Sequence, residues 1–228
     1  MTMTLAFDVY GTLIDTHGLV TELREFAGDR AGEFSRVWRE KQLEYSFRRG
    51  LMHQYETFAV CTRQALDYTS ASCNVFLTSQ QKSLLLDRYA ALPAFSDAAS
   101  ALDDLRVAGF RLFAFSNGTA DAVETLFHNA GIREHFLDVL SVDDLCSFKP
   151  NPAVYSYFLR KSGATAGSAW LISSNPFDVI GAISAGMRAA WVKRSPDALF
   201  DPWGIEPTLT VAGLEELCGR LQASLSGE

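Results

Sequence analysis

Cysteine is scarce in this sequence, and its four occurrences form no pairing pattern. The 228 residues contain Cys61, Cys73, Cys146 and Cys218, with no C-x-x-C pair and no His/Cys cluster at zinc-binding spacing. A structural zinc site and a disulfide-stabilised secreted domain are therefore not expected. Four reduced thiols in a reducing cytoplasm fit this usage better.

Long hydrophobic runs and an excess of positive charge are also missing. No apolar run approaches the roughly 20 residues of a membrane helix, and the start MTMTLAFDVYGTLID turns polar too soon for a signal peptide. The formal net charge is −7, which gives no electrostatic reason to bind nucleic acid or an anionic membrane. We expect a soluble, cytoplasmic protein without either partner. A local basic pocket could still bind an anionic substrate.

The chain is long enough for one sizeable core and a smaller inserted unit. Residues 5–9 form a short apolar run before a glycine turn, which is typical of a buried parallel strand. Residues 16–92 then show helical periodicity, with helices expected at 33–49, 55–68 and 77–90. We therefore predict a helical cap at 16–92, inserted into a core made of 1–15 and 93–228.

Strand and helix patterns alternate after residue 93. Strands are expected at 110–115, 139–140, 169–172 and 188–192, and helices at 120–130, at 151–161 and up to about residue 185. This alternation predicts an α/β fold with a doubly wound, Rossmann-like parallel sheet.

Polar side chains follow several of the predicted strands. They are Asp8 and Thr12, Ser116 and Asn117, Lys149, and the segment from Ser173 to Asp178. Each has an ordinary alternative, since a lone Asp often caps a turn and Ser-Asn-Gly is a common turn. Parallel strands present their carboxyl ends at one edge of a sheet, so these side chains should converge on one site.

The motifs FDVYGTLID, FSNGT, KPNPAVY and SSNPFDVIGAISAGM resemble successive motifs of the haloacid dehalogenase superfamily. The cap segment WREKQLEYSFRRGLM extends the resemblance over nearly the whole chain. Most members of that superfamily transfer phosphoryl groups with Mg²⁺ and carry acids where this chain has Tyr10 and Ser174. Without those acids a hard dication lacks charged oxygen ligands beyond Asp8. At these positions the chain resembles the L-2-haloacid dehalogenase (type II) family.

That resemblance implies hydrolysis of short-chain L-2-haloacids to D-2-hydroxy acids, with a 2-haloalkanoate substrate, a halide product, no cofactor and no metal. The implied catalytic residues are Asp8, Thr12, Arg39, Ser116, Lys149, Tyr155, Ser173, Asn175 and Asp178. The implied substrate and halide pocket consists of Tyr10, Arg39, Leu43, Phe58, Ser116, Asn117 and Phe177, where some relatives carry Trp at the last position. Members are often homodimers, and the apolar, aromatic cap helices are compatible with that state.

In this scheme Asp8 attacks Cα and forms an ester, and Asp178 activates the water that hydrolyses it. Lys149 keeps Asp8 ionised and oriented, since a nearby cation favours the carboxylate form. Ser116 and the N–H groups after it hold the substrate carboxylate, and Arg39 binds halide or carboxylate from the cap helix.

Several alternatives stay open at this point. Asp178 could instead cap a helix beginning at Val179, Tyr155 could be plain core, and Arg39 could be a solvated surface residue. A small-molecule phosphatase of the same superfamily or a non-catalytic relative are the competing functions. The residues leave the preferred halide and chain length undecided.

Overall fold

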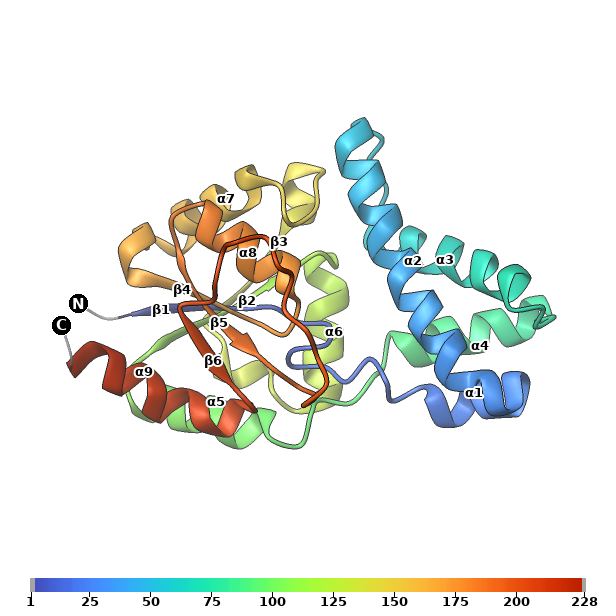
Figure 1. Cartoon of the computed structure of the whole chain (residues 1–228), viewed down its shortest axis with the longest axis horizontal. Coiled ribbons are helices and arrows are strands. Elements are labelled where there is room, and N and C mark those ends of the chain that lie inside the picture. The colour runs from blue at the N-terminus through green and yellow to red at the C-terminus, as the bar shows by residue number, and fades with distance from the viewer. Residues whose placement is uncertain (1–2, 227–228) are drawn as a thin grey trace.

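A parallel sheet forms the centre of the larger part of the molecule (Figure 1). The computed structural model describes residues 3–226, and within them the sheet has six strands. The strands are β1 (Thr4–Phe7), β2 (Arg111–Ser116), β3 (Asp138–Ser141), β4 (Ala169–Ser173), β5 (Arg188–Val192) and β6 (Leu209–Val211). They lie in the order β3-β2-β1-β4-β5-β6, and every neighbouring pair is parallel. The predicted doubly wound sheet is therefore confirmed, with β6 as an additional strand that the sequence analysis did not include.

Helices cover both faces of this sheet. One face carries α5 (Ala98–Val107), α6 (Ala120–Ala130) and α9 (Leu217–Ser226); the other carries α7 (Pro152–Ser162) and α8 (Pro176–Ser184). Side chains of β1 alternate between the faces, so that Leu5 and Phe7 join the hydrophobic cluster of α5, α6 and α9, whereas Ala6 joins that of α7 and α8. Burial on both sides explains why this strand is apolar throughout.

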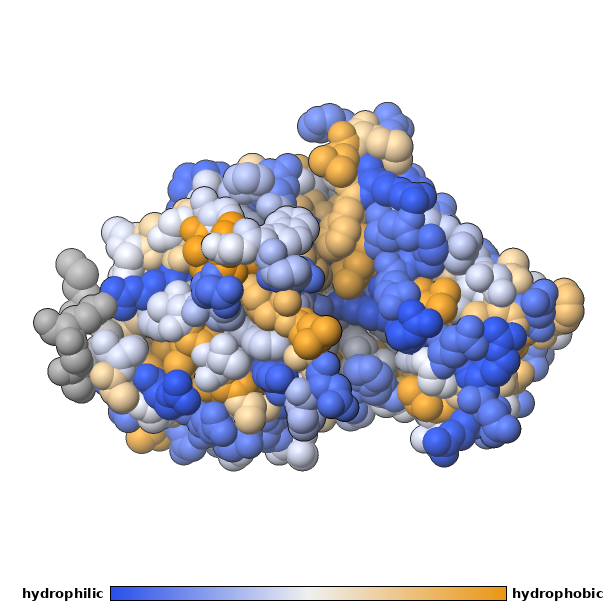
Figure 2. Space-filling view, viewed as in Figure 1, coloured by the Kyte–Doolittle hydropathy of each residue, from blue (hydrophilic) through white to orange (hydrophobic). Residues whose placement is uncertain are grey.

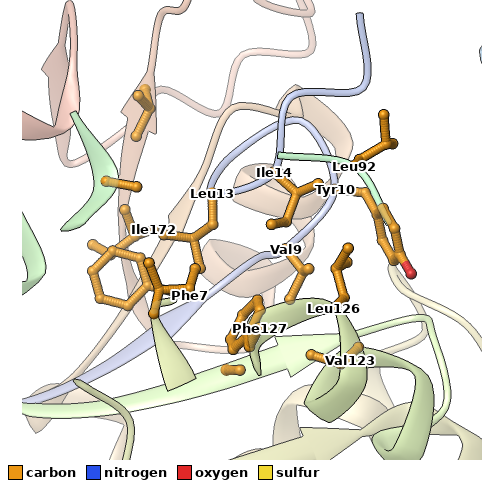
Figure 3. Close-up of a cluster of buried hydrophobic side chains, with 14 of the residues drawn as sticks. Phe7, Val9, Tyr10, Leu13, Ile14, Leu92, Val123, Leu126, Phe127 and Ile172 are labelled. Carbon is orange, nitrogen blue, oxygen red and sulfur yellow. The ribbon is translucent and has the colours of Figure 1, made fainter. Parts of the chain in front are cut away.

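The strand order reverses at β1, because β2 and β4 flank it and the chain runs outward from both sides. Ligands of open α/β sheets bind at the carboxyl ends of the strands next to such a reversal. β1 ends at Phe7, two residues earlier than predicted, and Asp8 is the first residue beyond it. The carbonyl of Val9 instead accepts hydrogen bonds from the backbone N–H groups of Leu13 and Ile14, both at 3.0 Å. The tight loop formed in this way is anchored in the hydrophobic core (Figure 3).

Four further helices lie together beside the part that holds the sheet (Figure 1). They are α1 (Val20–Ala27), α2 (Ala31–Met52), α3 (Phe58–Ser72) and α4 (Ser79–Tyr89). The segments that lead into and out of this group run side by side, since Asp15 N–H donates to the Pro93 carbonyl and Phe95 N–H to that of Leu13, each at 2.9 Å. This is the geometry of an insertion. The surface between the two parts is hollowed and lined in part by hydrophobic residues (Figure 2).

The helices of this group differ by a few residues from the predicted ranges. Thr57 accepts a hydrogen bond from Val60 N–H, so α3 begins at Phe58 rather than at Tyr55. Thr78 and Gln81 form a reciprocal capping box that starts α4 at Ser79. Among the described residues, 3–226, no helix is both long and apolar enough to cross a membrane.

Helices α7 and α8 approach each other closely at Gly181. A Cβ atom at that position would lie 2.8 Å from Cβ of Pro150 and 2.9 Å from the ring atom Cε2 of Tyr155, and it would also meet the Tyr155 hydroxyl. Tyr155 is fully buried and has no free space to move into. Glycine at 181 is therefore required by packing.

We predict that Gly181→Ala lowers the free energy of unfolding by about 1–3 kcal/mol or more, the usual cost of overpacking a core. Gly32→Ala in α2 is the control, because an added Cβ there meets nothing within 4 Å. It should leave stability unchanged or raise it by up to about 1 kcal/mol through helix propensity. Urea unfolding of both variants measures the difference, and equal stabilities would contradict the packing account.

Candidate active site

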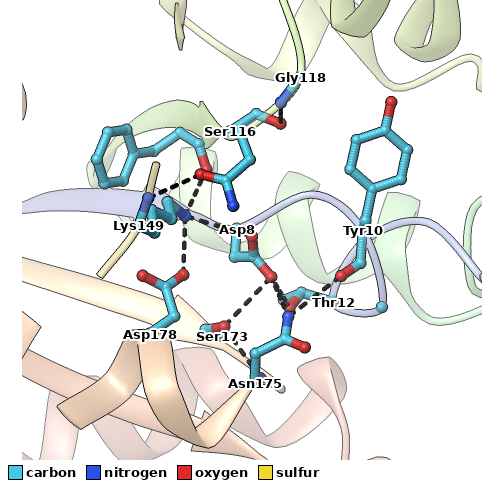
Figure 4. A network of polar contacts seen from close by, with 12 residues as sticks. Asp8, Tyr10, Thr12, Ser116, Gly118, Lys149, Ser173, Asn175 and Asp178 are labelled. Carbon is cyan, nitrogen blue, oxygen red and sulfur yellow. Dashed lines mark hydrogen bonds and ion pairs between the residues drawn. The ribbon is translucent and has the colours of Figure 1, made fainter. Parts of the chain in front are cut away.

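Asp8 lies at the centre of a buried polar network at the carboxyl ends of β1 and β4 (Figure 4). Its Oδ2 atom accepts three hydrogen bonds, from Asn175 Nδ2 at 2.7 Å, Thr12 Oγ1 at 2.9 Å and Ser173 Oγ at 3.2 Å. Its Oδ1 atom faces the Lys149 ammonium at 3.3 Å. The two oxygens therefore have different surroundings, since Oδ2 is surrounded by donors and Oδ1 has a single, longer contact to Lys149.

Lys149 is 1% exposed and lies between two carboxylates. Its Nζ atom is 2.8 Å from Oδ2 of Asp178, 3.3 Å from Asp8 and 2.8 Å from the carbonyl oxygen of Phe115. An ammonium group has three donors, and these three acceptors match them. The Lys149 N–H also donates to Oδ1 of Asn117 at 2.9 Å, which ties the loop after β2 to the lysine.

Asp178 is completely buried in the first turn of α8. Burial raises the pKa of this carboxyl to about 6, with Lys149 lowering it and Asp8 raising it. The Tyr155 hydroxyl donates to its Oδ1 at 2.8 Å, and burial beside Asp178 raises the pKa of Tyr155 well above its ordinary value. The alternative of Asp178 as an N-cap is wrong, because α8 begins at Pro176 with Asn175 at the capping position. Tyr155 both packs in the core and binds the carboxylate.

The loop after β2 brings Ser116 to the same edge of the sheet. Its Oγ atom accepts a hydrogen bond from Gly118 N–H at 3.0 Å, and Thr119 caps the helix α6 that follows. Asn117 is buried, and its side-chain oxygen Oδ1 accepts the hydrogen bond from the Lys149 N–H. Ser116 thus lies between the end of β2 and the beginning of α6, and its role toward a substrate stays a prediction.

The helices of residues 16–92 contribute Arg39 and aromatic side chains. Arg39 donates from Nη1 to Oε1 of Gln42 at 2.6 Å and from Nη2 to the Tyr10 carbonyl at 3.2 Å. The Tyr10 ring lies against Phe58 and stacks on Tyr89, with ring centres 5.6 and 5.7 Å apart. Arg39 is therefore a partly buried residue that contacts the loop carrying Asp8, which excludes the solvated alternative.

Two of the predicted pocket residues lie apart from this network. Phe177 packs edge-to-face on Phe47, with ring centres 5.0 Å apart, and joins α8 to α2. Leu43 is half-buried on α2, and its carbonyl accepts a hydrogen bond from Ser46. Their roles toward a substrate stay predictions.

Three contributors to the site were not among the predicted catalytic or pocket residues. Ser174 donates to the Gly11 carbonyl at 2.7 Å, while its N–H donates to Thr12 Oγ1 at 2.9 Å, so it locks the loop after β1. Tyr89 stacks on Tyr10 and donates to Gln42 at 3.1 Å. Phe148 contacts the rings of Tyr55 and Phe58 immediately before Lys149. Each depends on a contact between segments distant in the chain.

The two carboxylates of this site share one cation, Lys149. Among residues 3–226 no group of three or more His, Cys, Asp or Glu residues lies close enough to hold one. Both Asp8 and Asp178 face the same lysine, which supplies the positive charge that a dication would bring.

A parallel sheet with an aspartate directly after its first strand, backed by a buried lysine and a second aspartate, defines a hydrolase site of one recognisable class. A family model described as haloacid dehalogenase-like hydrolase matches residues 2–186. The chain belongs to this family, as the sequence motifs predicted.

Within the family the chain is similar to enzymes named for 2-haloacids. It is 34% identical to (S)-2-haloacid dehalogenase 2 of Pseudomonas sp. strain CBS-3 over 93% of both chains. It is 38% identical to the (S)-2-haloacid dehalogenase of Xanthobacter autotrophicus over 87% of this chain and 78% of that protein. The structure of L-2-haloacid dehalogenase from X. autotrophicus superposes with a TM-score of 0.91 at 30% identity, covering 98% of this chain and 99% of that one.

We predict that Lys149→Met lowers the free energy of unfolding by roughly 3–5 kcal/mol at neutral pH, because it leaves two buried carboxylates without their cation. Loss of the lysine raises the pKa of Asp178 further. A carboxyl whose pKa is higher in the folded than in the unfolded state contributes stability only while protonated, so that contribution disappears as pH rises. The destabilisation should therefore be larger at pH 8 than at pH 5.

Urea unfolding at both pH values measures this difference. The matched control is the double variant Lys149→Met/Asp178→Asn, which removes both charges and should recover part of the loss at pH 8. A destabilisation independent of pH would show that the ion pair is not its cause.

Proposed function

We propose that this protein is an (S)-2-haloacid dehalogenase that hydrolyses short-chain L-2-haloacids to D-2-hydroxy acids. The observation that carries the proposal is the asymmetric setting of Asp8, whose Oδ2 is held by three donors while Oδ1 faces only Lys149 among the described residues. The similar X. autotrophicus enzyme is also known with chloropropionic acid covalently bound, at 30% identity and a TM-score of 0.90 over 97% of this chain and 99% of that one. A covalent ester on Asp8 is the corresponding intermediate.

In the first step Oδ1 of Asp8 attacks Cα of the substrate from the side opposite the halogen. The Cα–O bond forms as the carbon–halogen bond breaks, and the electron pair leaves with the halide. A halide needs no proton to depart, so a tyrosine at position 10 instead of an acid suits this chemistry. The configuration at Cα inverts once.

In the second step Asp178 accepts a proton from water, and the water oxygen attacks the carboxyl carbon of the Asp8 ester. Negative charge then develops on Oδ2, which the donors of Thr12, Ser173 and Asn175 already surround. Donors fixed in advance at an oxyanion are among the strongest contributions to catalysis. Cleavage of the bond between Oδ1 and that carbon releases the hydroxy acid, whose oxygen takes the proton held by Asp178, and the carboxyl of Asp8 then loses the second water proton to solvent, which regenerates both carboxylates.

Arg39 and Ser116 are the groups we assign to the substrate carboxylate and the departing halide, because Arg39 contacts the loop that follows Asp8, Ser116 ends the strand next to β1, and both can donate hydrogen bonds. The walls around them are the predicted pocket residues, namely Tyr10, Leu43, Phe58, Asn117 and Phe177. We assign residues 1–15 and 93–228 to a catalytic core and 16–92 to a cap over the carboxyl ends of the strands. A homodimer in the cytoplasm completes the proposal.

We predict release of chloride from L-2-chloropropionate in the presence of EDTA at the same rate as without it, since Lys149 rather than a metal ion balances the carboxylates. Asp8→Asn should lower the rate at least about 100-fold, because a neutral amide is a poor nucleophile. Asp15→Asn, a change in the same loop away from the network, is the control and should keep the activity. Chloride release lost in EDTA, or full activity in Asp8→Asn, would each refute part of the mechanism.

We predict that kcat falls toward acid pH with an apparent pKa below the value of about 6 in the free enzyme, because Asp178 acts as a base only when ionised and the Asp8 charge that raises its pKa is lost in the ester. Above that value the rate should be level with respect to this group. Asp178→Asn should lower turnover at least about 100-fold and accumulate the Asp8 ester, which intact-protein mass spectrometry detects as one added propionate. If only unmodified Asp178→Asn protein is found after substrate is added, a residue other than Asp178 is the base.

A further inference from the structure

Arg194 and Asp97 form an ion pair that the mechanism above does not use. Arg194 lies two residues beyond the end of β5, at the carboxyl edge of the sheet, and its Nη1 atom is 2.6 Å from Oδ2 of Asp97. The two side chains are only 17% and 18% exposed. Burial alone would raise the pKa of Asp97, but the hydrogen bonds from Arg194 and from the Leu214 N–H, the latter at 2.8 Å, outweigh it and lower that pKa. The pair is therefore charged at neutral pH.

The same guanidinium group contacts both segments that join the helices of residues 16–92 to the rest of the chain. Its Nη2 atom donates to the Thr12 carbonyl at 2.5 Å, in the segment that leads into these helices. Its central carbon Cζ lies 4.0 Å from the centre of the Phe95 ring, in the segment that leads back. A planar guanidinium can bridge a carboxylate and a carbonyl while it stacks on a ring, which an ammonium group cannot do. One side chain thus connects both segments to the end of β5.

The backbone of Thr12 is directly linked to the chemistry at Asp8. Thr12 is fully buried, and its hydroxyl donates to Oδ2 of Asp8 at 2.9 Å and accepts from the Ser174 N–H at 2.9 Å. Because a β-branched side chain has few accessible rotamers, the position of the backbone decides where this hydroxyl points. In the proposed second step the hydroxyl is one of the donors around the oxygen on which negative charge develops.

We propose that Arg194 is a positioning residue for this reaction, which holds the backbone of Thr12 so that the threonine hydroxyl points at Oδ2 of Asp8. This rests on the proposed function. In the part of the chain that the structure describes, the hydrogen bonds and ring contact of Arg194 involve neither Arg39 nor Ser116, the groups assigned to the substrate. Its effect therefore falls on turnover and not on substrate binding.

The test is a double-mutant cycle on kcat for L-2-chloropropionate. Loss of a donor at an oxyanion costs about 100-fold or more in kcat, and a displaced donor costs less, so Arg194→Met should lower kcat at least about tenfold and change KM less than about threefold. In Thr12→Ala, which has no hydroxyl to position, the same change should lower kcat less than about twofold. Full kcat in Arg194→Met, or losses that multiply in the double variant, would overturn the proposal.

Arg133→Met is the matched control. Arg133 likewise binds a carboxylate, that of Glu124, and donates to a carbonyl, that of Phe136 at 2.8 Å, and its side chain is 23% exposed. It lies just before β3, at the amino edge of the sheet opposite the site. This variant should be destabilised to a similar extent in urea and keep its kcat. An equal kcat loss in both variants would show that lowered stability is the cause.

The variant Asp97→Asn/Arg194→Met guards against a failure to fold. It leaves neither charge of the pair unpaired, so it should be more stable than Arg194→Met alone. Its asparagine can still accept the hydrogen bond from the Leu214 N–H. We expect the same loss of kcat as in Arg194→Met, and an unchanged kcat in this folded protein would refute the positioning role.

Hydrogen exchange followed by mass spectrometry separates this inference from the proposed function. If the wild type releases no halide from any 2-haloacid, the dehalogenase proposal fails. The positioning of Thr12 by Arg194 then stands if the amides of residues 11–15 exchange at least about tenfold faster in Arg194→Met than in Arg133→Met. It falls if the two variants exchange at equal rates in this segment.

Discussion

The buried ammonium group of Lys149 is the interaction on which the rest of the site depends. It places one positive charge between Asp8 and Asp178 in a region from which water is excluded. Two buried carboxylates that share one cation cannot be equivalent, and the more deeply buried Asp178 has the raised pKa, about 6. In the proposed mechanism the same lysine faces both the nucleophile, Asp8, and the base, Asp178. The side-chain oxygen of Asn117 accepts a hydrogen bond from the Lys149 backbone N–H, and the Phe115 carbonyl accepts one from its ammonium group, so both fix the position of the lysine.

The two oxygens of Asp8 have different hydrogen-bond partners. Thr12, Ser173 and Asn175 come from loops after β1 and β4, which meet because these strands are neighbours in the sheet. They orient the carboxylate in the resting enzyme and, in the proposed second step, surround the oxygen on which charge develops. The donors are already oriented in the folded protein and need not reorganise during the reaction. This is how preorganised sites accelerate acyl transfer.

Aromatic residues connect the loop that carries Asp8 to the helices of residues 16–92. The Tyr10 carbonyl accepts a hydrogen bond from Asn175 in the polar network, and the Tyr10 ring contacts Phe58 of α3 and Tyr89 of α4. A displacement of the helices of residues 16–92 would therefore also displace the loop that carries Asp8.

The sequence by itself determined the alternation of strands and helices, the family, and the convergence of Asp8, Ser116, Lys149 and Asp178, because hydrophobic periodicity and motifs at strand ends are local signals. It misjudged the end of β1, where the Val9 carbonyl accepts hydrogen bonds from Leu13 and Ile14 in a tight loop, and the first residue of α8, which is Pro176. Only the tertiary structure decided that Lys149 lies closer to Asp178 than to Asp8, that Ser174 and Tyr89 support the site, and that an apolar cavity lies beside Tyr10. These features arise between segments up to about 160 residues apart, whose distances depend on how the layers pack and not on any local pattern.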